Sequence, residues 1–376
     1  MKSPFFLREI ALDDSFCDRE LELKELCNHG RSFTNIVLYS PRRYGKTSLV
    51  KRVQATLANE GVITVYCQFY GVISEEDVAS RFAKAIFSVT HQHESIFRKA
   101  ARLFTAYRPV MTVETGTEKG LLLSVQLTKT NLSGHDLLED VMESIDSFVQ
   151  NVGVPIHIVL DEFQEITTLP NSRRIEGLLR EHIQRQKASY LFVGSRRGIL
   201  LSMFNERRRP FYASAINYPL PPLPEVDFQQ FIIDEFCKSG KNCESEASKK
   251  IVKLVECYPY YGQKLAYFVF NLVEKTATVA DVDEAFELLL KEETPVFESI
   301  YMGLSTQQIT LLHALANEPA NSIYAQEYMN RHRLGSIGGV QSALKKLVLL
   351  DLIERVPTAG WRIVDPIFSK WIVKNS

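Results

Sequence analysis

The spacing of apolar and polar residues predicts an alternation of buried strands and amphipathic helices over the first 220 residues. Apolar residues at helical spacing indicate helices that bury one face. Continuous apolar runs are typical of parallel strands that are buried on both faces. The predicted helices cover residues 20–26, 48–59, 77–103, 134–150 and 174–186, and the predicted strands cover residues 36–39, 62–70, 155–160 and 188–193. This order predicts an α/β fold with a parallel sheet.

One segment interrupts the alternation. Residues 108–130 hold two β-rich runs that flank a polar, glycine-containing stretch at 115–120, which is the pattern of a β-hairpin. We expect this hairpin at the rim of the sheet. The helix before it would carry His91 and His93, two residues apart and so on different faces, as solvated side chains rather than metal ligands.

The pattern changes after a cluster of prolines at positions 219, 221, 222 and 224, which indicates a hinge between domains. Residues 226–290 are helical in pattern throughout. The last part predicts three helices, at 305–315, 323–331 and 337–349, and then two short strands at 352–356 and 361–364. This order resembles a winged helix. We therefore expect three domains: a nucleotide-binding domain at 1–223, a helical lid at 224–300 and a winged helix at 301–376.

Composition and charge limit the class of protein. The 376 residues include 44 Lys and Arg against 45 Asp and Glu, so bulk charge does not indicate a nucleic-acid binder. The six cysteines include no C-x-x-C pair, which favours reduced thiols in a cytoplasmic protein. No apolar run is long enough to span a bilayer, and none at the N-terminus is long enough for a secretory signal, so we expect no membrane insertion.

The connection after the first strand is the strongest chemical signal. Residues 40–47 read S-P-R-R-Y-G-K-T and match the phosphate-binding pattern G-x-x-x-x-G-K-[ST], except that Ser40 replaces the first glycine. Backbone N–H groups of such a loop, together with those at the helix N-terminus, hold a phosphate. Lys46 would contact the β- and γ-phosphates and Thr47 would bind Mg²⁺. The alternative is a chance G-K-T at the start of a helix.

Two later strands end in residues that complete such a site. The strand at 155–160 leads directly into Asp161 and Glu162, and a bound Mg²⁺-nucleotide would supply the counter-charge that these carboxylates need. Asp161 would hold Mg²⁺ through water and Glu162 would orient or deprotonate the attacking water. Ser195 would contact the γ-phosphate from the neighbouring strand. Glu162 as a surface acid and Ser195 as an ordinary helix cap remain the alternatives.

These motifs together resemble the archaeal-type ATPase family, a branch of the AAA+/STAND P-loop ATPases that is related to the Orc/Cdc6 initiators. The likeness covers almost the whole chain. The matching segments are F-C-D-R-E-L-E-L at 16–23, S-P-R-R-Y-G-K-T-S-L at 40–49, D-E-F-Q at 161–164, G-S at 194–195 and W-R-I-V-D-P-I-F-S-K-W at 361–371.

The resemblance implies an ATP- and Mg²⁺-dependent switch ATPase with slow turnover. It places the nucleotide base near residues 16–19, and it places Pro259 of the lid's G-x-P motif at the nucleotide. The residues expected to bind ATP or ADP are Arg19, Ser40, Pro41, Arg42, Arg43, Tyr44, Gly45, Lys46, Thr47, Ser48 and Pro259; those expected to take part in catalysis are Lys46, Glu162 and Ser195.

The chain departs from the family pattern at three places. Ser40 puts a β-carbon at a turn where a positive φ would be unfavourable for it, and we expect either a loss of about 1 kcal/mol in nucleotide binding or no effect. The family segment P-L-Y-G-R ends here in Ala213 and Ser214, so an arginine finger would come from the arginines at 207–209 or from a partner. The first position of the lid motif is Cys257 instead of glycine. The arginine runs at 196–197 and 207–209 are candidates to contact the nucleotide phosphates or DNA. The alternative is that they are solvated or paired with acidic residues.

The predicted winged helix leaves a second function open. If it binds DNA, its third helix enters the major groove. The candidate contacts are Ser336, Gln341, Ser342, Lys345 and Lys346. Residues 304–376 carry eight basic and five acidic residues, a weak basic excess, and winged helices also bind proteins. The alternative function is therefore a nucleotide-regulated, initiator-like DNA-binding protein with little hydrolysis, and a homo-oligomer or a protein partner is possible for either function.

Overall fold

A five-stranded parallel sheet organises the first part of the chain. The computed structural model describes residues 3–5, 17, 19–90, 94–104, 107–113, 121–127, 132–356 and 360–375. The sheet has the order β2-β5-β6-β1-β7, and every neighbouring pair in it is parallel. Its strands are β1 (Ile36–Tyr39), β2 (Ile63–Gln68), β5 (Ile156–Asp161), β6 (Ser189–Gly194) and β7 (Ile216–Pro219). This confirms the α/β fold.

Burial follows the position of each strand in the sheet. Every residue of β5 and β6 is buried, as the continuous apolar runs predicted. The prediction that β2 is buried on both faces is wrong: Ile63, Val65 and Cys67 are buried, but Thr64 and Tyr66 are only half-buried because β2 is an edge strand. The other edge strand, β7, is largely exposed and lacks an apolar run, and for this reason it was not predicted.

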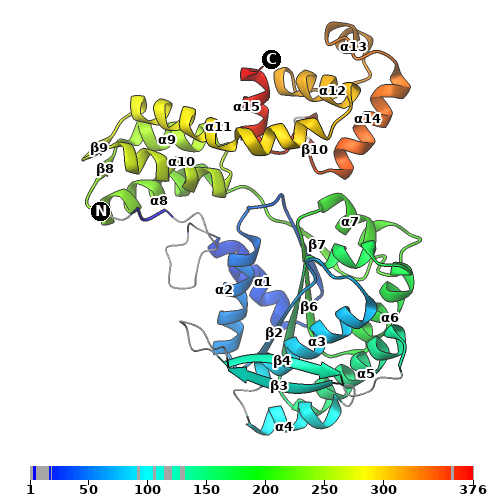
Figure 1. The fold of residues 1–376 in the computed structure, drawn as a ribbon. Coiled ribbons are helices and arrows are strands. Elements are labelled where there is room, and N and C mark those ends of the chain that lie inside the picture. Colours follow the sequence, from blue (N-terminus) through cyan, green and yellow to red (C-terminus); the bar gives the residue numbers. More distant parts are fainter. Residues whose placement is uncertain are drawn as a thin grey trace. The chain divides into compact units, whose positions relative to one another are not determined.

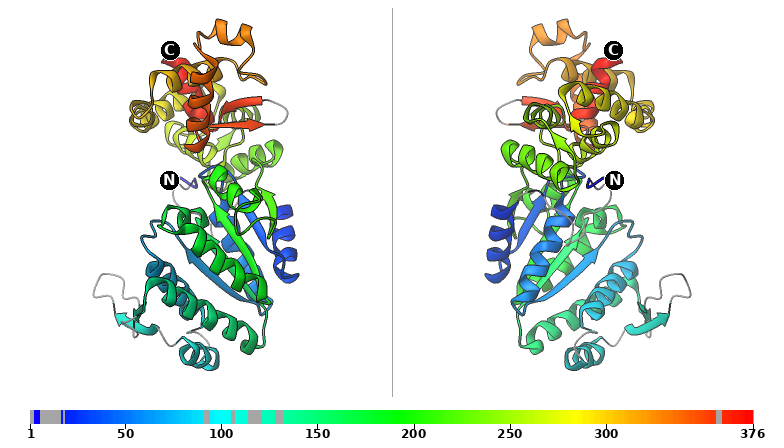
Figure 2. Two further views of the ribbon diagram at one scale, coloured as in Figure 1. Left: turned by 90° about the vertical axis from the view of Figure 1, so that its right-hand side faces the viewer. Right: turned by 90° about the vertical axis from the view of Figure 1, so that its left-hand side faces the viewer.

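Helices cover both faces of this sheet, with α1 and α2 on one face and α3, α5 and α6 on the other (Figures 1 and 2). The elements are α1 (Glu20–Arg31), α2 (Lys46–Asn59), α3 (Glu75–Thr90), α4 (Glu94–Leu103), α5 (Gly134–Val152), the 3₁₀ helix η1 (Phe163–Thr168), α6 (Ser172–Arg185) and α7 (Arg197–Asn205). The predicted single helix at 77–103 is wrong, because two helices, α3 and α4, occupy that range. His91 and His93 lie outside the described residues.

The predicted hairpin is confirmed in its strands. β3 (Tyr107–Val113) and β4 (Leu121–Leu127) pair in antiparallel fashion from Tyr107↔Leu127 to Val113↔Leu121. They form a two-stranded sheet of their own, which contacts α3 rather than extending the parallel sheet. The turn between the two strands lies outside the described residues.

The contacts divide the chain into two compact units. One consists of Glu20–Ser40 and Leu49–Leu220; the other consists of Met1–Arg19, Pro41–Ser48 and Pro221–Ser376. The phosphate-binding loop therefore belongs by its contacts to the second unit, whereas the strand before it belongs to the first. The predicted division into three domains at 223 and 300 remains a prediction.

The second unit is mostly helical and ends in the winged helix. Its elements are α8 (Glu225–Lys238), β8 (Asn242–Cys243), α9 (Ser245–Leu254), α10 (Pro259–Leu272), β9 (Thr276–Ala277), α11 (Val279–Met302), α12 (Thr306–Asn317), α13 (Gln326–Arg331), α14 (Ile337–Leu349), β10 (Ile353–Val356), β11 (Gly360–Ile363) and α15 (Pro366–Lys374). The three predicted helices and two wing strands are present. Helix α15 was not predicted; Asp365 caps it by accepting the N–H groups of Ile367 and Phe368. No helix in the described part of the chain is long and apolar enough to cross a membrane.

Candidate nucleotide site

The loop after β1 adopts two left-handed backbone conformations. Arg43 has φ 62° and Gly45 has φ 83°. Ser40 is not among the residues with positive φ, so the expected strain at that position is wrong. The serine is 2% exposed and directly follows β1. The non-glycine residue that bears a left-handed conformation in this loop is Arg43, for which that conformation costs about 1–2 kcal/mol.

Lys46 contacts the backbone of the loop that precedes it. Lys46, the first residue of α2, is 7% exposed, and its Nζ donates to the carbonyl oxygen of Pro41 at 2.8 Å. Its ammonium group therefore lies against the loop's own backbone. Thr47 is half-buried and Ser48 is buried. Because the N-terminus of a helix carries partial positive charge and unpaired N–H groups, this arrangement suits a bound phosphate.

Residues at the start of α10 contact the loop through their side chains. The hydroxyl of Tyr258 donates to the carbonyl oxygen of Arg42, and the ring of Tyr44 stands edge-on to the ring of Tyr258 with 4.6 Å between centroids. The guanidinium of Arg43 lies 4.2 Å from the centroid of the Tyr260 ring. The sequence motifs assign no role to Tyr258. No sequence pattern predicts a hydrogen bond from a tyrosine hydroxyl to a backbone carbonyl so far away along the chain.

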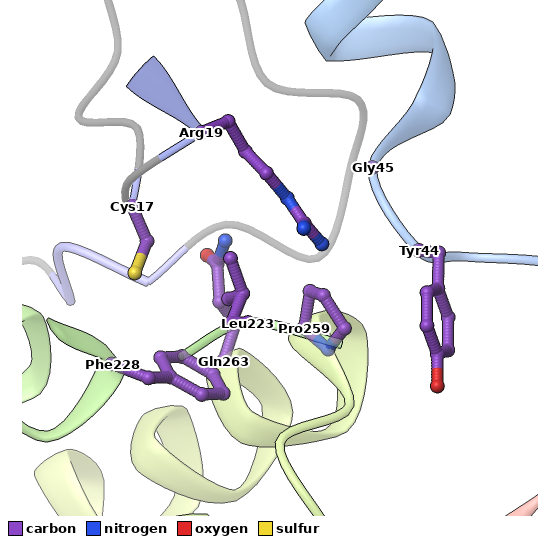
Figure 3. Close-up of a pocket in the computed structure, with 8 residues that line it drawn as sticks. All are labelled: Cys17, Arg19, Tyr44, Gly45, Leu223, Phe228, Pro259 and Gln263. Atoms are coloured by element: carbon purple, nitrogen blue, oxygen red, sulfur yellow. The ribbon is translucent and has the colours of Figure 1, made fainter. Parts of the chain in front are cut away.

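A pocket with an empty volume of about 350 Å³, open to solvent in part, lies beside the loop (Figure 3). Leu223, Phe228 and Pro259 give it apolar walls, whereas Arg19 and Gln263 bring polar groups. Cys17, Tyr44 and Gly45 complete the lining. Four residues that the sequence analysis assigned to the nucleotide therefore line one pocket: Arg19, Tyr44, Gly45 and Pro259. Asp18 and Phe16, from the same motif, lie outside the described residues.

In the parallel sheet, the carboxyl ends of β1, β5 and β6 meet at one edge. Tyr39 pairs with Gly194, and Leu160 pairs with Phe192, so Ser40, Asp161 and Ser195 leave neighbouring strands at similar levels. Asp161 is 5% exposed. Its Oδ1 accepts the N–H of Glu162 at 3.0 Å, and its Oδ2 accepts the hydroxyl of Tyr66 from β2.

Glu162 and Ser195 are brought together at this edge. The Ser195 hydroxyl donates to Oε2 of Glu162 at 3.0 Å, and the amide of Gln164 donates to the same oxygen. Glu162 adopts a left-handed conformation with φ 51° and ψ 40°. A β-carbon at Gly194 would lie 2.0 Å from Oε1 of Gln164, so the glycine makes room for this amide. Gln164 belongs to the D-E-F-Q motif, but its contact with Glu162 was not predicted.

The donor chemistry at this edge suits a hard cation. Among the described residues, no group of three or more His, Cys, Asp or Glu side chains could hold a metal ion. Mg²⁺ does not require such a group, because it is usually held by one or two carboxylates, water and the phosphates of the substrate. At this edge, Asp161 supplies a buried carboxylate. Thr47, which belongs to the other unit, carries a hydroxyl, which is also an oxygen ligand.

The arginines proposed as fingers differ in their surroundings. Nη2 of Arg209 lies 2.6 Å from Oε1 of Glu176, which is fully buried, so Arg209 forms an internal ion pair. Burial raises the pKa of Glu176 to about 7, and the nearby Arg209 and Arg173 act in the opposite direction. Arg207 and Arg208 are exposed. Arg196 lies 3.6 Å from Glu165 on η1.

The third helix of the winged helix, α14, presents its polar residues to solvent. Val340, Ala343 and Leu347 are buried against the domain. The five residues proposed to contact DNA are all exposed: Ser336, Gln341, Ser342, Lys345 and Lys346. Ser336 also caps the helix by accepting the N–H of Gly339 at 3.2 Å.

Two segments of the chain match models of known protein families. A family described as an ATPase domain predominantly from Archaea matches residues 16–265, and a family described as a probable winged helix domain matches residues 295–374. A comparison with curated proteins gave no match.

Several solved structures share the fold over nearly the whole chain. The Walker-type ATPase PABY2304 of Pyrococcus abyssi has a TM-score of 0.71 and 15% identity, covering 98% of this chain and 99% of its own. The ORC2 protein of Aeropyrum pernix, solved as ADPNP–ADP complexes, has a TM-score of 0.58 and 15% identity, covering 98% and 96%. The ORC1 protein of the same organism, solved with DNA, has a TM-score of 0.52 and 14% identity, covering 100% and 98%.

Proposed function

Because the chain belongs to the family of ATPase domains found predominantly in Archaea, we propose that it binds Mg²⁺–ATP and hydrolyses it slowly as a conformational switch. The observation that carries this proposal is the loop at residues 40–47. It follows a central strand, contains the left-handed Gly45 and leads into the buried Lys46 at the start of α2. A chance G-K-T sequence would not require this combination of strand, turn and helix.

The phosphates are proposed to bind at the loop, with the base in the pocket beside it. The pocket's apolar walls suit the faces of a nucleobase, and Arg19 and Gln263 can contact its polar edge. Lys46 would exchange its bond with the Pro41 carbonyl for the β- and γ-phosphates. ATP rather than GTP is proposed from the family, because nothing in the pocket selects against guanine.

Thr47 and Asp161 are proposed to hold Mg²⁺, which would neutralise charge on the phosphates. The two residues belong to different units of the chain, so their meeting at a bound nucleotide is part of the proposal. Glu162 would orient and deprotonate the attacking water, because Ser195 and Gln164 fix the position of its carboxylate. Ser195 would also contact the γ-phosphate.

Slow turnover is proposed because two of the candidate sources of an arginine finger within this chain are lost. Arg209 is held by the buried Glu176, and Ser214 replaces the family arginine. Fast hydrolysis would therefore need an arginine from another protomer or protein. The exposed Arg207 and Arg208 could supply it to a second copy of this chain.

Steady-state ATP turnover by the wild type and by Glu162→Gln tests the enzymatic part of this proposal. We expect Glu162→Gln to keep ATP affinity and to lose turnover by about 100-fold or more. Glu181→Gln, which changes an exposed carboxylate on α6, is the matched control and should turn over like the wild type. Equal turnover by the wild type and Glu162→Gln would contradict ATP hydrolysis at this site.

The exposed face of α14 favours a second candidate function, nucleotide-regulated DNA binding with little hydrolysis. Gln341, Lys345 and Lys346 lie on the solvent side of the helix that enters the major groove in winged helices. DNA affinity measured over a salt series, with and without ATP, tests this function. Lys345→Glu with Lys346→Glu should reduce affinity and make the salt dependence shallower. Unchanged DNA affinity in this variant would exclude α14 as the contact.

A further inference from the structure

Tyr258 contacts the phosphate-binding loop in two ways. Its hydroxyl donates to the Arg42 carbonyl oxygen, and its ring packs edge-on against Tyr44 at an interplanar angle of 81°. Tyr258 is 4% exposed and Tyr44 is 7% exposed, so both rings are removed from water. The hydrogen bond therefore fixes the peptide group that links Arg42 to Arg43.

That peptide group needs an external support. Arg43 follows it in a left-handed conformation that non-glycine residues adopt at a cost of about 1–2 kcal/mol. A fixed Arg42 carbonyl limits the rotation of this peptide and helps to aim the N–H groups of the loop. The Arg43 side chain is held as well, because its guanidinium lies over the ring of Tyr260.

On its other side, Tyr258 is linked to the winged helix. Its ring centroid lies 5.2 Å from that of Tyr261, and the Tyr261 hydroxyl donates to Oδ2 of Asp365 at 2.6 Å. Oδ1 of Asp365 accepts the N–H groups of Ile367 and Phe368, which caps α15. Tyr261 is 2% exposed. The same carboxylate thus joins the lid helix α10 to the first turn of α15.

Helix α15 is in turn anchored to α11. The Trp371 ring lies 5.8 Å from that of Phe297, and its Nε1 donates to Thr294 Oγ1 at 3.0 Å. Phe297 also packs against Phe368, with 5.1 Å between centroids. A change in how α15 sits on α11 would therefore move the Asp365 carboxylate relative to Tyr261.

We propose that Tyr258 is a positioning residue of the phosphate-binding loop, and that Tyr261 and Asp365 connect it to the winged helix. The conformation of the loop, and with it nucleotide affinity, depends on how α15 is seated. The inference about affinity rests on the proposed function. The inference about the loop conformation does not, because it concerns contacts within the chain itself.

Tyrosine-to-phenylalanine variants remove one hydroxyl each and keep the rings. Tyr258→Phe breaks the bond to the loop, and Tyr261→Phe breaks the bond to Asp365 without removing any hydrogen bond to the loop. Tyr328→Phe is the matched control, because the Tyr328 hydroxyl donates to the Glu318 carbonyl oxygen at 2.8 Å within the winged helix, away from the loop. Thermal unfolding of each variant verifies that it is folded.

Hydrogen–deuterium exchange of residues 41–47 without nucleotide is the first measurement. We expect faster exchange in Tyr258→Phe and in Tyr261→Phe, and wild-type exchange in Tyr328→Phe. Wild-type exchange in folded Tyr258→Phe would overturn the positioning role. Wild-type exchange in Tyr261→Phe alone would overturn the link to the winged helix.

ATP affinity is the second measurement. Loss of one buried hydrogen bond that supports the loop should weaken binding by about 3–10-fold in either variant. The double variant should bind about as weakly as Tyr258→Phe alone, because the two hydroxyls act in series. Independent losses that multiply would contradict a connected path. If the wild type binds no ATP, the proposed function fails, and the exchange measurement still decides the positioning role.

Discussion

Arg209 and Glu176 form an ion pair inside the unit that contains the parallel sheet, called the sheet unit below, with 2.6 Å between Nη2 of the arginine and Oε1 of the glutamate. Glu176 has no exposed surface, and the Arg209 side chain is 13% exposed. A buried carboxylate needs a partner of opposite charge to remain ionised. Arg209 therefore has a structural role in this chain, although the sequence alone made it a candidate arginine finger.

We expect Arg209→Met to lower the free energy of unfolding by about 3–5 kcal/mol at pH 8, because it leaves Glu176 buried without its partner. The loss should be smaller at pH 5, because burial raises the pKa of Glu176 to about 7 and the protonated acid needs no counter-charge. Urea unfolding at the two pH values measures this difference. Arg208→Met, at an exposed position, should stay within about 0.5 kcal/mol of the wild type. Unchanged stability of Arg209→Met would contradict the structural role.

Ala213 and Cys257 stand where the family motifs have glycine, and both adopt left-handed conformations, with φ 55° and 57°. Ala213 is exposed, so its methyl group makes little packing contribution. Ala213→Gly should raise the free energy of unfolding by about 1 kcal/mol, because the left-handed penalty is removed. The same change at Ala55, within α2, should lower it by about 1 kcal/mol. If urea unfolding shows that the free energy of unfolding changes in the same direction in both variants, this account is contradicted.

His157 makes the sheet unit sensitive to acid. It lies in β5, is 3% exposed and shares a hydrogen bond with the Ser189 hydroxyl at 2.8 Å. Burial lowers the pKa of His157 to about 4. Below pH 6.5 the unfolded chain therefore takes up a proton that the folded chain excludes, and stability falls until the pH reaches the folded pKa.

Between pH 7 and pH 4, this residue should remove about 3 kcal/mol from the free energy of unfolding. In His157→Gln that contribution is absent. Urea unfolding at a series of pH values should therefore show a smaller decline for the variant than for the wild type. Parallel declines would show that His157 does not carry the acid sensitivity.

The sequence was sufficient for elements with strong periodicity and for motifs that follow a strand. The buried strands β5 and β6, the helix after the loop and the three helices of the winged helix were all predicted. Strand β7 was missed because an exposed edge strand has no apolar run. The division into α3 and α4 was not predicted, although residues 90–95, T-H-Q-H-E-S, are all polar and interrupt the apolar spacing. Helix α15 was not predicted, although Asp365-Pro366 is a signal for the start of a helix.

The residues proposed for the site can be chosen by type from the sequence, but the contacts that they make cannot. Lys46, Asp161, Glu162 and Ser195 stand in motifs with fixed spacing. The contacts of Tyr66 with Asp161 and of Tyr258 with Arg42 join residues 95 and 216 positions apart, and no local pattern marks them. The position of the backbone strain was likewise not predictable, because it falls on Arg43 rather than on Ser40.

The central claim is that the loop after β1 binds a nucleoside triphosphate. Calorimetric titration of ATP into the wild type and Lys46→Met, each with Mg²⁺ and with EDTA, tests it most directly. We expect the wild type to bind ATP with Mg²⁺ and less tightly with EDTA. Lys46→Met should bind about 10–100-fold more weakly, because it loses a charge-assisted bond to phosphate. Equal ATP affinity of the wild type and a folded Lys46→Met would contradict the claim.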